Sequence, residues 1–543
     1  MAWYDEAVFY HIYPLGLLGA PKKNSYGKVE HRLKELEPWI DHVVEIGCTA
    51  IYIGPLFESV GHGYETTDYK KLDSRLGTNE DLKEFVQKCH EKGIRVIFDG
   101  VFNHTGRDFF AFQDIKHNRE NSRYKDWYCN VNFWGNNEYN DGFSYANWGG
   151  YDLLVKLNQN NQEVKNYICD VIRYWVKEFD VDGIRLDAAD VLDFNYMKEL
   201  RKTANEVKPD FWLMGEVIHG EYSRWANDST LHSVTNYHLH KALYSAHNDH
   251  NYFEIAHTVK RLSSTGKLQL YNFVDNHDVE RIYTKLRNKS HFLPTHILLY
   301  TLPGIPSLYY GSEFGIEGRK ERYSDDSIRP ALKLENFSKD NAYAQIVTAL
   351  GKIRQNVPAL SYGNYEELQL TTKQYAFARS FEGQSVLVMV NNDDQAATFR
   401  VKANGSFIGA LSGEQVKANG TLEVTIPANS GEIWLPEESV GDWKEKTIVR
   451  QKIEQSKPVE KKVEQPKVEV NVQEIIKEEP KKVEEKKPVS VPNKPYEQMT
   501  IEELQAAILE KLAKNGPVTD RMRKDVAENV YHNSLINWVK SFR

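Results

Sequence analysis

Three acidic residues, Asp187, Glu216 and Asp278, each follow a short run of mostly apolar residues. Runs this short, bounded by turn residues, are typical of buried parallel strands. A charge at the carboxyl end of a buried strand is costly unless it faces a cleft, and in a β/α barrel that end is where catalysis takes place. We therefore expect the three carboxyl groups to lie together in one site.

Such a group of acids could cleave a glycosidic bond. One carboxylic acid protonates the leaving oxygen, while a second carboxylate attacks the anomeric carbon or guides a water to it. A separation of about 5–5.5 Å between the two carboxyl groups gives a covalent intermediate and retention of configuration. Asp187 and Glu216 end consecutive predicted strands, so the pattern favours a retaining pair. Asp278 could hold sugar hydroxyls and distort the ring.

The neighbouring residues assign the two roles. Arg185 lies two residues before Asp187, so both side chains leave the same face of a strand. Its guanidinium would hold the pKa of Asp187 low, as a nucleophile requires. Glu216 follows apolar residues 212–214 and has no cation within two residues. A drier setting raises the pKa of a carboxyl group, which suits a general acid.

Strand-like segments interleaved with helix-like segments would position these residues. The strand-like segments are residues 8–14, 50–55, 95–99, 183–187, 212–217, 233–237, 270–276 and 305–310. Between the second and the third, Thr78 and Asp81 form a capping box, and Gly93 ends the helix. The alternation across residues 1–362 predicts an α/β fold, a TIM (β/α)8 barrel.

The predicted barrel is interrupted after its third strand. Residues of about 105–157 have weak periodicity and many aromatic side chains, including Trp127, Trp134, Trp148 and Tyr151. A segment of this length inside a domain is a small subdomain or a functional lid. We expect this inserted subdomain to form one wall of the cleft.

Three further parts follow the barrel. Residues 363–437 show the alternation of a C-terminal antiparallel β-sandwich. Residues 438–495 are dominated by Lys, Glu, Pro and Val, which bury too little apolar surface to fold, so we expect a disordered linker. Residues 496–543 indicate a small helical tail module, whose first helix opens at Thr500 with Glu503. This module is either a docking unit for a protein partner or for self-association, or a self-contained cap.

Bulk composition narrows the range of partners. The 543 residues carry a net charge of −8, which gives no reason to expect nucleic acid or an anionic membrane as a partner. No run approaches the ~20 apolar residues of a membrane span, and the N-terminus lacks the features of a signal peptide. None of the four cysteines has metal-binding spacing. We expect a cytoplasmic protein, although a processed extracellular form would have the same composition.

Four segments, in order, resemble the signature regions of the α-amylase family, glycoside hydrolase family 13. They are Asp99–His104, Gly183–Asp187, Gly215–Val217 and Phe273–Asp278. Residues 62–64 and 304–311 also resemble family segments, and the resemblance covers about residues 4–437. Four motifs in order on predicted barrel strands are far more specific than any one of them.

The resemblance implies roles for particular residues. Asp187 would be the nucleophile, Glu216 the acid/base and Asp278 the stabiliser of the transition state. The residues expected to contact the substrate, the last of them by stacking on the reacting sugar, are Arg185, His104, His277 and Tyr64. Asp99 and Asn103 are expected to have structural roles near the site.

The resemblance also implies a substrate class. We expect a retaining glycosidase that hydrolyses α-glucosidic bonds in maltodextrins, cyclodextrins or related α-glucan oligosaccharides. Residues 153–158 resemble a segment on the neopullulanase, cyclomaltodextrinase and oligo-1,6-glucosidase side of the family. The alternative is a transglycosylase or isomerase, such as a glucanotransferase or a trehalose synthase-like enzyme. An inactive scaffold or binding protein fits less well, because the chain keeps all three carboxylates.

No required cofactor is expected. α-Amylases usually carry Lys-His three and four residues after the nucleophile, and the carbonyl of that His belongs to the family's calcium site. Asp190 and Val191 stand there in this chain. Asn103, another calcium ligand of the family, remains, so calcium bound through Asn103 is the minority alternative.

Overall fold

The computed structural model describes residues 2–264, 268–322, 324–439, 495–496 and 499–514. Contacts divide the chain into two compact units, Met1–Val459 and Glu460–Arg543. Within the described ranges, no helix is both long enough and apolar enough to cross a membrane.

The first unit contains eight parallel strands in the order β11-β10-β9-β5-β2-β1-β13-β12. They are β1 (Phe9–Ile12), β2 (Ala50–Ile53), β5 (Arg95–Gly100), β9 (Gly183–Leu186), β10 (Trp212–Gly215), β11 (Ser233–Val234), β12 (Tyr271–Phe273) and β13 (Ile305–Tyr309). A parallel bridge between Thr235 and Tyr271 joins the two ends of this order. Each predicted strand segment overlaps one of these strands, so the predicted TIM barrel is confirmed.

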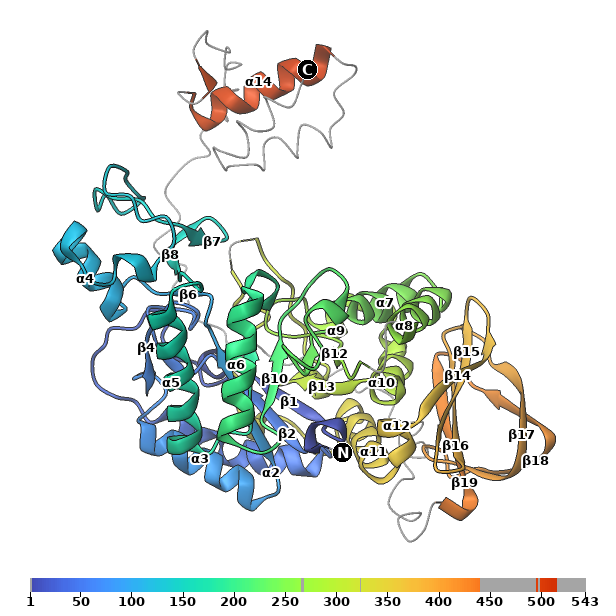
Figure 1. The fold of residues 1–543 in the computed structure, drawn as a ribbon. Helices are drawn as coiled ribbons and strands as arrows, with labels where there is room; N and C mark the ends of the chain where they lie inside the picture. Colours follow the sequence, from blue (N-terminus) through green and yellow to red (C-terminus); the bar gives the residue numbers. More distant parts are fainter. Residues whose placement is uncertain (1, 265–267, 323, 440–494, 497–498, 515–543) are drawn as a thin grey trace, which may run out of the picture. The chain divides into compact units, whose positions relative to one another are not determined.

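Helices surround the strands (Figure 1). The longer ones are α2 (Glu37–Glu45), α3 (Asn79–Glu91), α5 (Gln162–Phe179), α6 (Phe194–Val207), α7 (Tyr237–Asn248), α8 (Phe253–Ser264), α10 (Phe292–Thr301) and α11 (Ala342–Asn356). The short ones are α1 (Pro14–Leu17), α9 (Ile282–Lys285) and α12 (Pro358–Tyr362), and α4 (Phe110–Asn118) belongs to the inserted subdomain. The predicted capping box of α3 is confirmed, because the Thr78 amide donates to Asp81 Oδ2 at 2.8 Å and the Asp81 amide donates to Thr78 Oγ1 at 3.3 Å.

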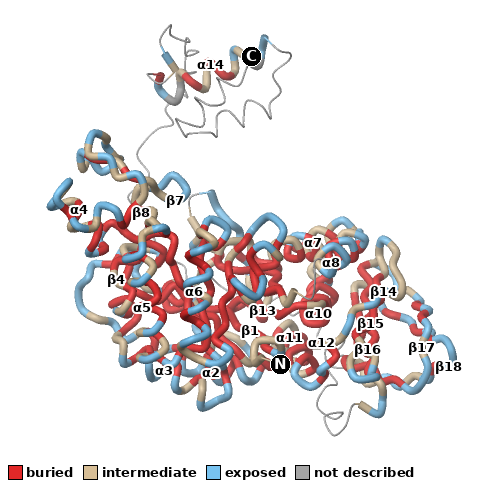
Figure 2. The backbone as a smooth tube through the Cα atoms, in the orientation of Figure 1, coloured by how far each residue is buried: buried red, intermediate tan, exposed pale blue. Residues whose placement is uncertain are grey.

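The amino-terminal part of the barrel interior is apolar. Phe9 and Trp212 stack there with their ring centroids 5.1 Å apart. A Cβ atom on Gly183 would lie 2.5 Å from the Trp212 carbonyl oxygen, so glycine leaves the room that β10 needs beside β9. Figure 2 shows that the barrel strands are buried. Polar side chains begin one layer higher, at the carboxyl ends of the strands, where Arg185 lies.

A small subdomain stands between β5 and α5, at the carboxyl ends of the strands (Figure 1). Its sheet has the order β6-β8-β7, formed by β6 (His104–Thr105), β8 (Tyr151–Lys156) and β7 (Asn147–Trp148). Before it, β3 (Phe57–Ser59) and β4 (Thr66–Leu72) form an antiparallel pair. The subdomain therefore begins at His104, shortly after the carboxyl end of β5.

The C-terminal part of the first unit is antiparallel, as predicted. Its strands are β14 (Asn364–Leu370), β15 (Gln374–Phe381), β16 (Gln384–Asn391), β17 (Ala397–Gly409), β18 (Gln415–Ile426) and β19 (Ser430–Pro436). They form one sheet in the order β14-β15-β16-β19-β17-β18, and Phe399, Leu422 and Trp434 share an apolar cluster on it. The two layers of the expected sandwich are thus parts of one continuous sheet that curves (Figure 1).

The second unit contains helix α14 (Ile501–Lys514). The Thr500 amide donates to Glu503 Oε2 at 2.7 Å, and the Glu503 amide donates to Thr500 Oγ1 at 3.3 Å, which is the predicted capping box. The predicted linker of residues 438–495 lies almost entirely outside the described residues, and so do residues 515–543 of the predicted tail module. A protein partner or self-association through this module stays a prediction.

Candidate active site

Arg185 is the centre of the candidate site. Its Nη1 atom donates to Asp99 Oδ1 and to Asp187 Oδ1, each at 2.9 Å. Its Nη2 atom lies 2.9 Å from Glu216 Oε2. The arginine is only 2% exposed. Asp187 and Glu216 therefore meet on one buried cation.

Strand pairing explains this meeting. β9 and β10 pair in parallel with Leu186 opposite Gly215, so Asp187 and Glu216 are the first residues beyond the paired ends. The predicted shared face of Arg185 and Asp187 is confirmed by their contact. The side chains of Asp187 and Glu216 are 12% and 13% exposed, so the buried pair keeps an opening to solvent.

Burial dominates the pKa values of this pair. It raises the pKa of Glu216, as expected, and it also raises the pKa of Asp187. The Arg185 guanidinium opposes both increases. One expectation is therefore wrong: Arg185 does not hold the pKa of Asp187 low. Glu216 has no cation near it in the sequence, but the fold brings Arg185 beside it. One guanidinium between two buried carboxyl groups favours a single proton on the pair, which leaves one acid and one carboxylate.

Asp278 has a different environment. Its Oδ1 atom accepts from Arg329 Nη2 at 2.9 Å, and its Oδ2 atom lies 3.0 Å from His277 Nε2. Burial alone would raise the pKa of Asp278, but His277 and Arg329 together hold it well below its usual range. The Asp278 side chain is 34% exposed, more than either member of the buried pair. The third acid is thus a fixed negative charge facing the opening.

Aromatic rings and imidazoles line the space beside these acids. The Tyr64 hydroxyl donates to Asp99 Oδ2 at 3.0 Å, and its ring lies nearly parallel to that of His277, with centroids 5.7 Å apart. Tyr13 lies nearly parallel to His277 as well, at 5.8 Å. His104 Nε2 is 3.1 Å from the Tyr64 carbonyl oxygen, and burial lowers the pKa of His104 to about 4. Near neutral pH this imidazole is therefore uncharged.

Contacts connect all nine predicted site residues into one cluster. It consists of Tyr64, Asp99, Asn103, His104, Arg185, Asp187, Glu216, His277 and Asp278. Sequence reasoning missed Tyr13, which stacks on His277, and two further contributors. Tyr52 donates its hydroxyl to Asp99 Oδ2 at 2.8 Å, and Arg329 holds Asp278. Arg329 also forms an ion pair at 2.9 Å with Asp325, four residues earlier in the chain. That short spacing is visible in the sequence, but nothing in the sequence links Arg329 to Asp278.

The surroundings of Asn103 test the calcium alternative. Asn103 Oδ1 accepts from Gln159 Nε2 at 3.0 Å, and Gln159 Oε1 accepts from the Asp193 amide at 2.6 Å. The oxygen that would bind a cation therefore already faces an amide donor. Across the part of the chain that the structure describes, no group of three or more His, Cys, Asp or Glu residues is arranged to hold a metal. In this structure the Asn103 side-chain oxygen is thus bonded to Gln159.

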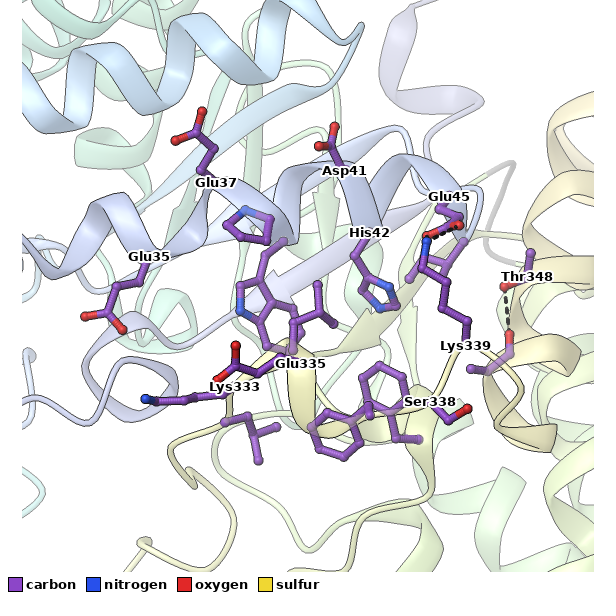
Figure 3. Close-up of a pocket in the computed structure, with 18 of the residues that line it drawn as sticks. Glu35, Glu37, Asp41, His42, Glu45, Lys333, Glu335, Ser338, Lys339 and Thr348 are labelled. Carbon is purple, nitrogen blue, oxygen red and sulfur yellow. Dashed lines mark hydrogen bonds and ion pairs between the residues drawn. The ribbon is translucent and has the colours of Figure 1, made fainter.

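A cavity of about 1170 Å³ is separate from the cluster. It lies between α2 and α11 (Figure 3). Trp39, Phe314 and Phe337 form part of its wall, and charged side chains from α2 such as Glu37 and Glu45 stand around it. No residue of the nine-residue cluster lines this cavity, so the candidate active site lies elsewhere.

A β/α barrel with a pair of carboxyl groups at the carboxyl ends of adjacent strands is the architecture of barrel glycosidases. Comparison with known families agrees. The family model described as the α-amylase catalytic domain matches residues 24–352. The chain belongs to the α-amylase family and is a glycoside hydrolase.

Individual relatives show which members of the family this chain resembles. The chain is 30% identical over 449 residues to a cyclomaltodextrinase from Thermoanaerobacter pseudethanolicus, covering 77% of this chain and 76% of that protein. It is 29% identical to neopullulanase 2 from Thermoactinomyces vulgaris, covering 79% of this chain and 78% of that protein. A solved structure of a debranching enzyme from Nostoc punctiforme matches with a TM-score of 0.70 at 27% identity, covering 80% of this chain and 98% of that chain. The expected resemblance to the neopullulanase and cyclomaltodextrinase side is confirmed.

Proposed function

We propose that this chain hydrolyses α-glucosidic bonds in maltodextrins, cyclodextrins or related α-glucan oligosaccharides, with retention of anomeric configuration. The observation that carries the proposal is the contact of Asp187 and Glu216 with the two nitrogens of one guanidinium. A retaining mechanism needs two carboxyl groups close together, one protonated and one ionised. The names of the relatives support the substrate class.

In the first step, Glu216 gives its proton to the glycosidic oxygen while a carboxylate oxygen of Asp187 forms a bond to the anomeric carbon. The bond from that carbon to the leaving oxygen breaks, and the leaving sugar departs with a new hydroxyl group. In the second step, Glu216 takes a proton from water, the water oxygen attacks the same carbon, and the bond to Asp187 breaks. The raised pKa of Glu216 favours the protonated form that a general acid needs.

The other site residues hold the reacting sugar. Asp278, kept ionised by Arg329 and His277, places a negative charge beside the positive charge that develops on the sugar ring. In this proposal His104 and His277 exchange hydrogen bonds with sugar hydroxyls. Tyr64 offers a ring face on which the sugar stacks.

Product analysis tests this proposal. The full-length protein would be incubated with maltotriose, pullulan and β-cyclodextrin, and the anomer first released would be followed by NMR. We expect shorter glucans whose new reducing ends appear first as the α-anomer. The β-anomer as the first product would contradict retention, and the absence of any product from all three substrates would contradict the substrate class. Products longer than the substrate would instead indicate the transglycosylase alternative.

A further inference from the structure

The turn that joins β7 to β8 carries two exposed aromatic side chains. Trp148 is 38% exposed and Tyr151 is 59% exposed, and only Gly149 and Gly150 separate them. The Trp148 ring lies against His104, with ring centroids 5.9 Å apart and an interplanar angle of 32°. Because His104 belongs to the candidate active site, Trp148 stands directly beside that site.

Hydrogen bonds hold this turn in one shape. Asn147 Nδ2 donates to Asp152 Oδ1 at 2.7 Å, and the Gly150 amide donates to Asn147 Oδ1 at 3.1 Å. Gly149 and Gly150 have positive φ angles of 66° and 84°, which favour glycine. The two rings are therefore presented by a fixed backbone.

The outer ring, Tyr151, packs against the turn. A Cβ atom on Gly149 would lie 3.3 Å from Tyr151 Cδ2, so the Tyr151 ring lies over the glycine. The β6-β8 pairing joins the turn to the active site, because His104 pairs with Lys156 at the far end of β8. Trp148 and Tyr151 thus extend outward from His104 on one connected sheet.

Exposed flat rings at this place suit a carbohydrate. The two rings stand next to each other beside the site, and the apolar face of a pyranose ring is a surface that packs well on an aromatic ring. A maltodextrin bound with one glucose at Asp187 and Glu216 carries further glucose units outward. We infer that Trp148 and Tyr151 form a binding platform for glucose units beyond the reacting one and make the enzyme favour longer α-glucan chains. This inference rests on the proposed function.

The test compares a long and a short substrate in the full-length protein. For Trp148→Ala, the ratio of kcat/KM for maltohexaose to kcat/KM for maltotriose falls about tenfold, the size expected for losing one aromatic contact. Trp148→Phe, which keeps a flat ring, retains most of the ratio. Trp134→Ala is the matched control, because Trp134 belongs to the same subdomain and is 98% exposed, and it leaves the ratio unchanged.

Calorimetric titration of maltohexaose into the inactive Asp187→Asn protein, with and without Trp148→Ala, gives a second readout in which the Kd rises about tenfold. An unchanged ratio, or an equal fall for both substrates, would overturn the inference while leaving the proposed function intact. A wild-type protein that neither cleaves nor binds either oligosaccharide would overturn both.

Discussion

The Nη2 atom of Arg185 lies 2.9 Å from Glu216 Oε2, across the boundary between β9 and β10. The same guanidinium holds Asp187 through its other nitrogen. One buried cation thus stabilises both members of the candidate catalytic pair, and its loss would leave both carboxyl groups without a counter-charge.

Replacing Arg185 with alanine is expected to destabilise the protein and to abolish hydrolysis. Removing one partner of a buried ion pair costs about 3–5 kcal/mol, because the remaining charge stays buried and uncompensated. Urea unfolding measures the change in the free energy of unfolding. The matched control is Arg173→Ala, because Arg173 is half exposed and its ion pair with Asp170 lies on the surface, where it is worth about 0–1 kcal/mol. Equal effects of the two changes would contradict the central role of Arg185.

The pH profile reports on Glu216. Burial raises its pKa, and the proposed acid must be protonated, so kcat/KM is expected to fall as pH rises through that raised pKa. Glu216→Gln has no proton to lose. On a maltotrioside with a nitrophenol leaving group, which needs no acid, this variant is expected to lack the alkaline fall. An alkaline fall that persists in Glu216→Gln would assign it to another group.

Predicting the fold from sequence succeeded where the signal is local. Short apolar runs located all eight strands, and four motifs located Asp187 and Glu216 at strand ends and Asp278 in the loop that follows β12. The contacts of Arg329 with Asp278 and of Arg185 with Glu216 were not predictable, because they depend on how the barrel closes. The raised pKa of Asp187 was missed for the same reason, since it depends on burial by many distant residues. Alternation in residues 363–437 predicted antiparallel strands but could not show that they form one curved sheet.

Buried neutral histidines make stability depend on pH. Burial lowers the pKa of His240 and of His247 to about 3 and that of His296 to about 4. Because these values lie below about 6.5, the value for an unfolded chain, the unfolded state binds more protons and stability falls as pH drops from about 6.5 towards 4. Each histidine is expected to cost about 2 kcal/mol at pH 5 relative to pH 7.

Urea unfolding of His247→Gln at pH 7 and pH 5 checks this pH dependence. The loss of stability between the two pH values is expected to be about 2 kcal/mol smaller than in the wild type. His117→Gln, which changes an exposed histidine, serves as the control and keeps the wild-type difference. A wild-type stability that is equal at pH 7 and pH 5 would contradict the prediction.

Activity is expected to survive removal of divalent cations. Asn103 Oδ1 is the side-chain oxygen that would bind calcium, and in this structure it accepts a hydrogen bond from Gln159 Nε2. A protein donor thus takes the place of the cation at this oxygen. Assays on maltotriose before and after treatment with EDTA measure the effect. Loss of activity with EDTA and its return with calcium would show that Asn103 binds the ion after all.

The central claim is that Asp187 attacks the sugar, and Asp187→Asn tests it most directly. The amide keeps the size of the side chain and an oxygen that can accept from Arg185, so the urea unfolding midpoint is expected to stay close to that of the wild type. Turnover of maltotriose is expected to fall by about 10⁴-fold or more, because an amide cannot form the covalent intermediate. A folded Asp187→Asn protein that hydrolyses maltotriose within about tenfold of the wild-type rate would contradict the account.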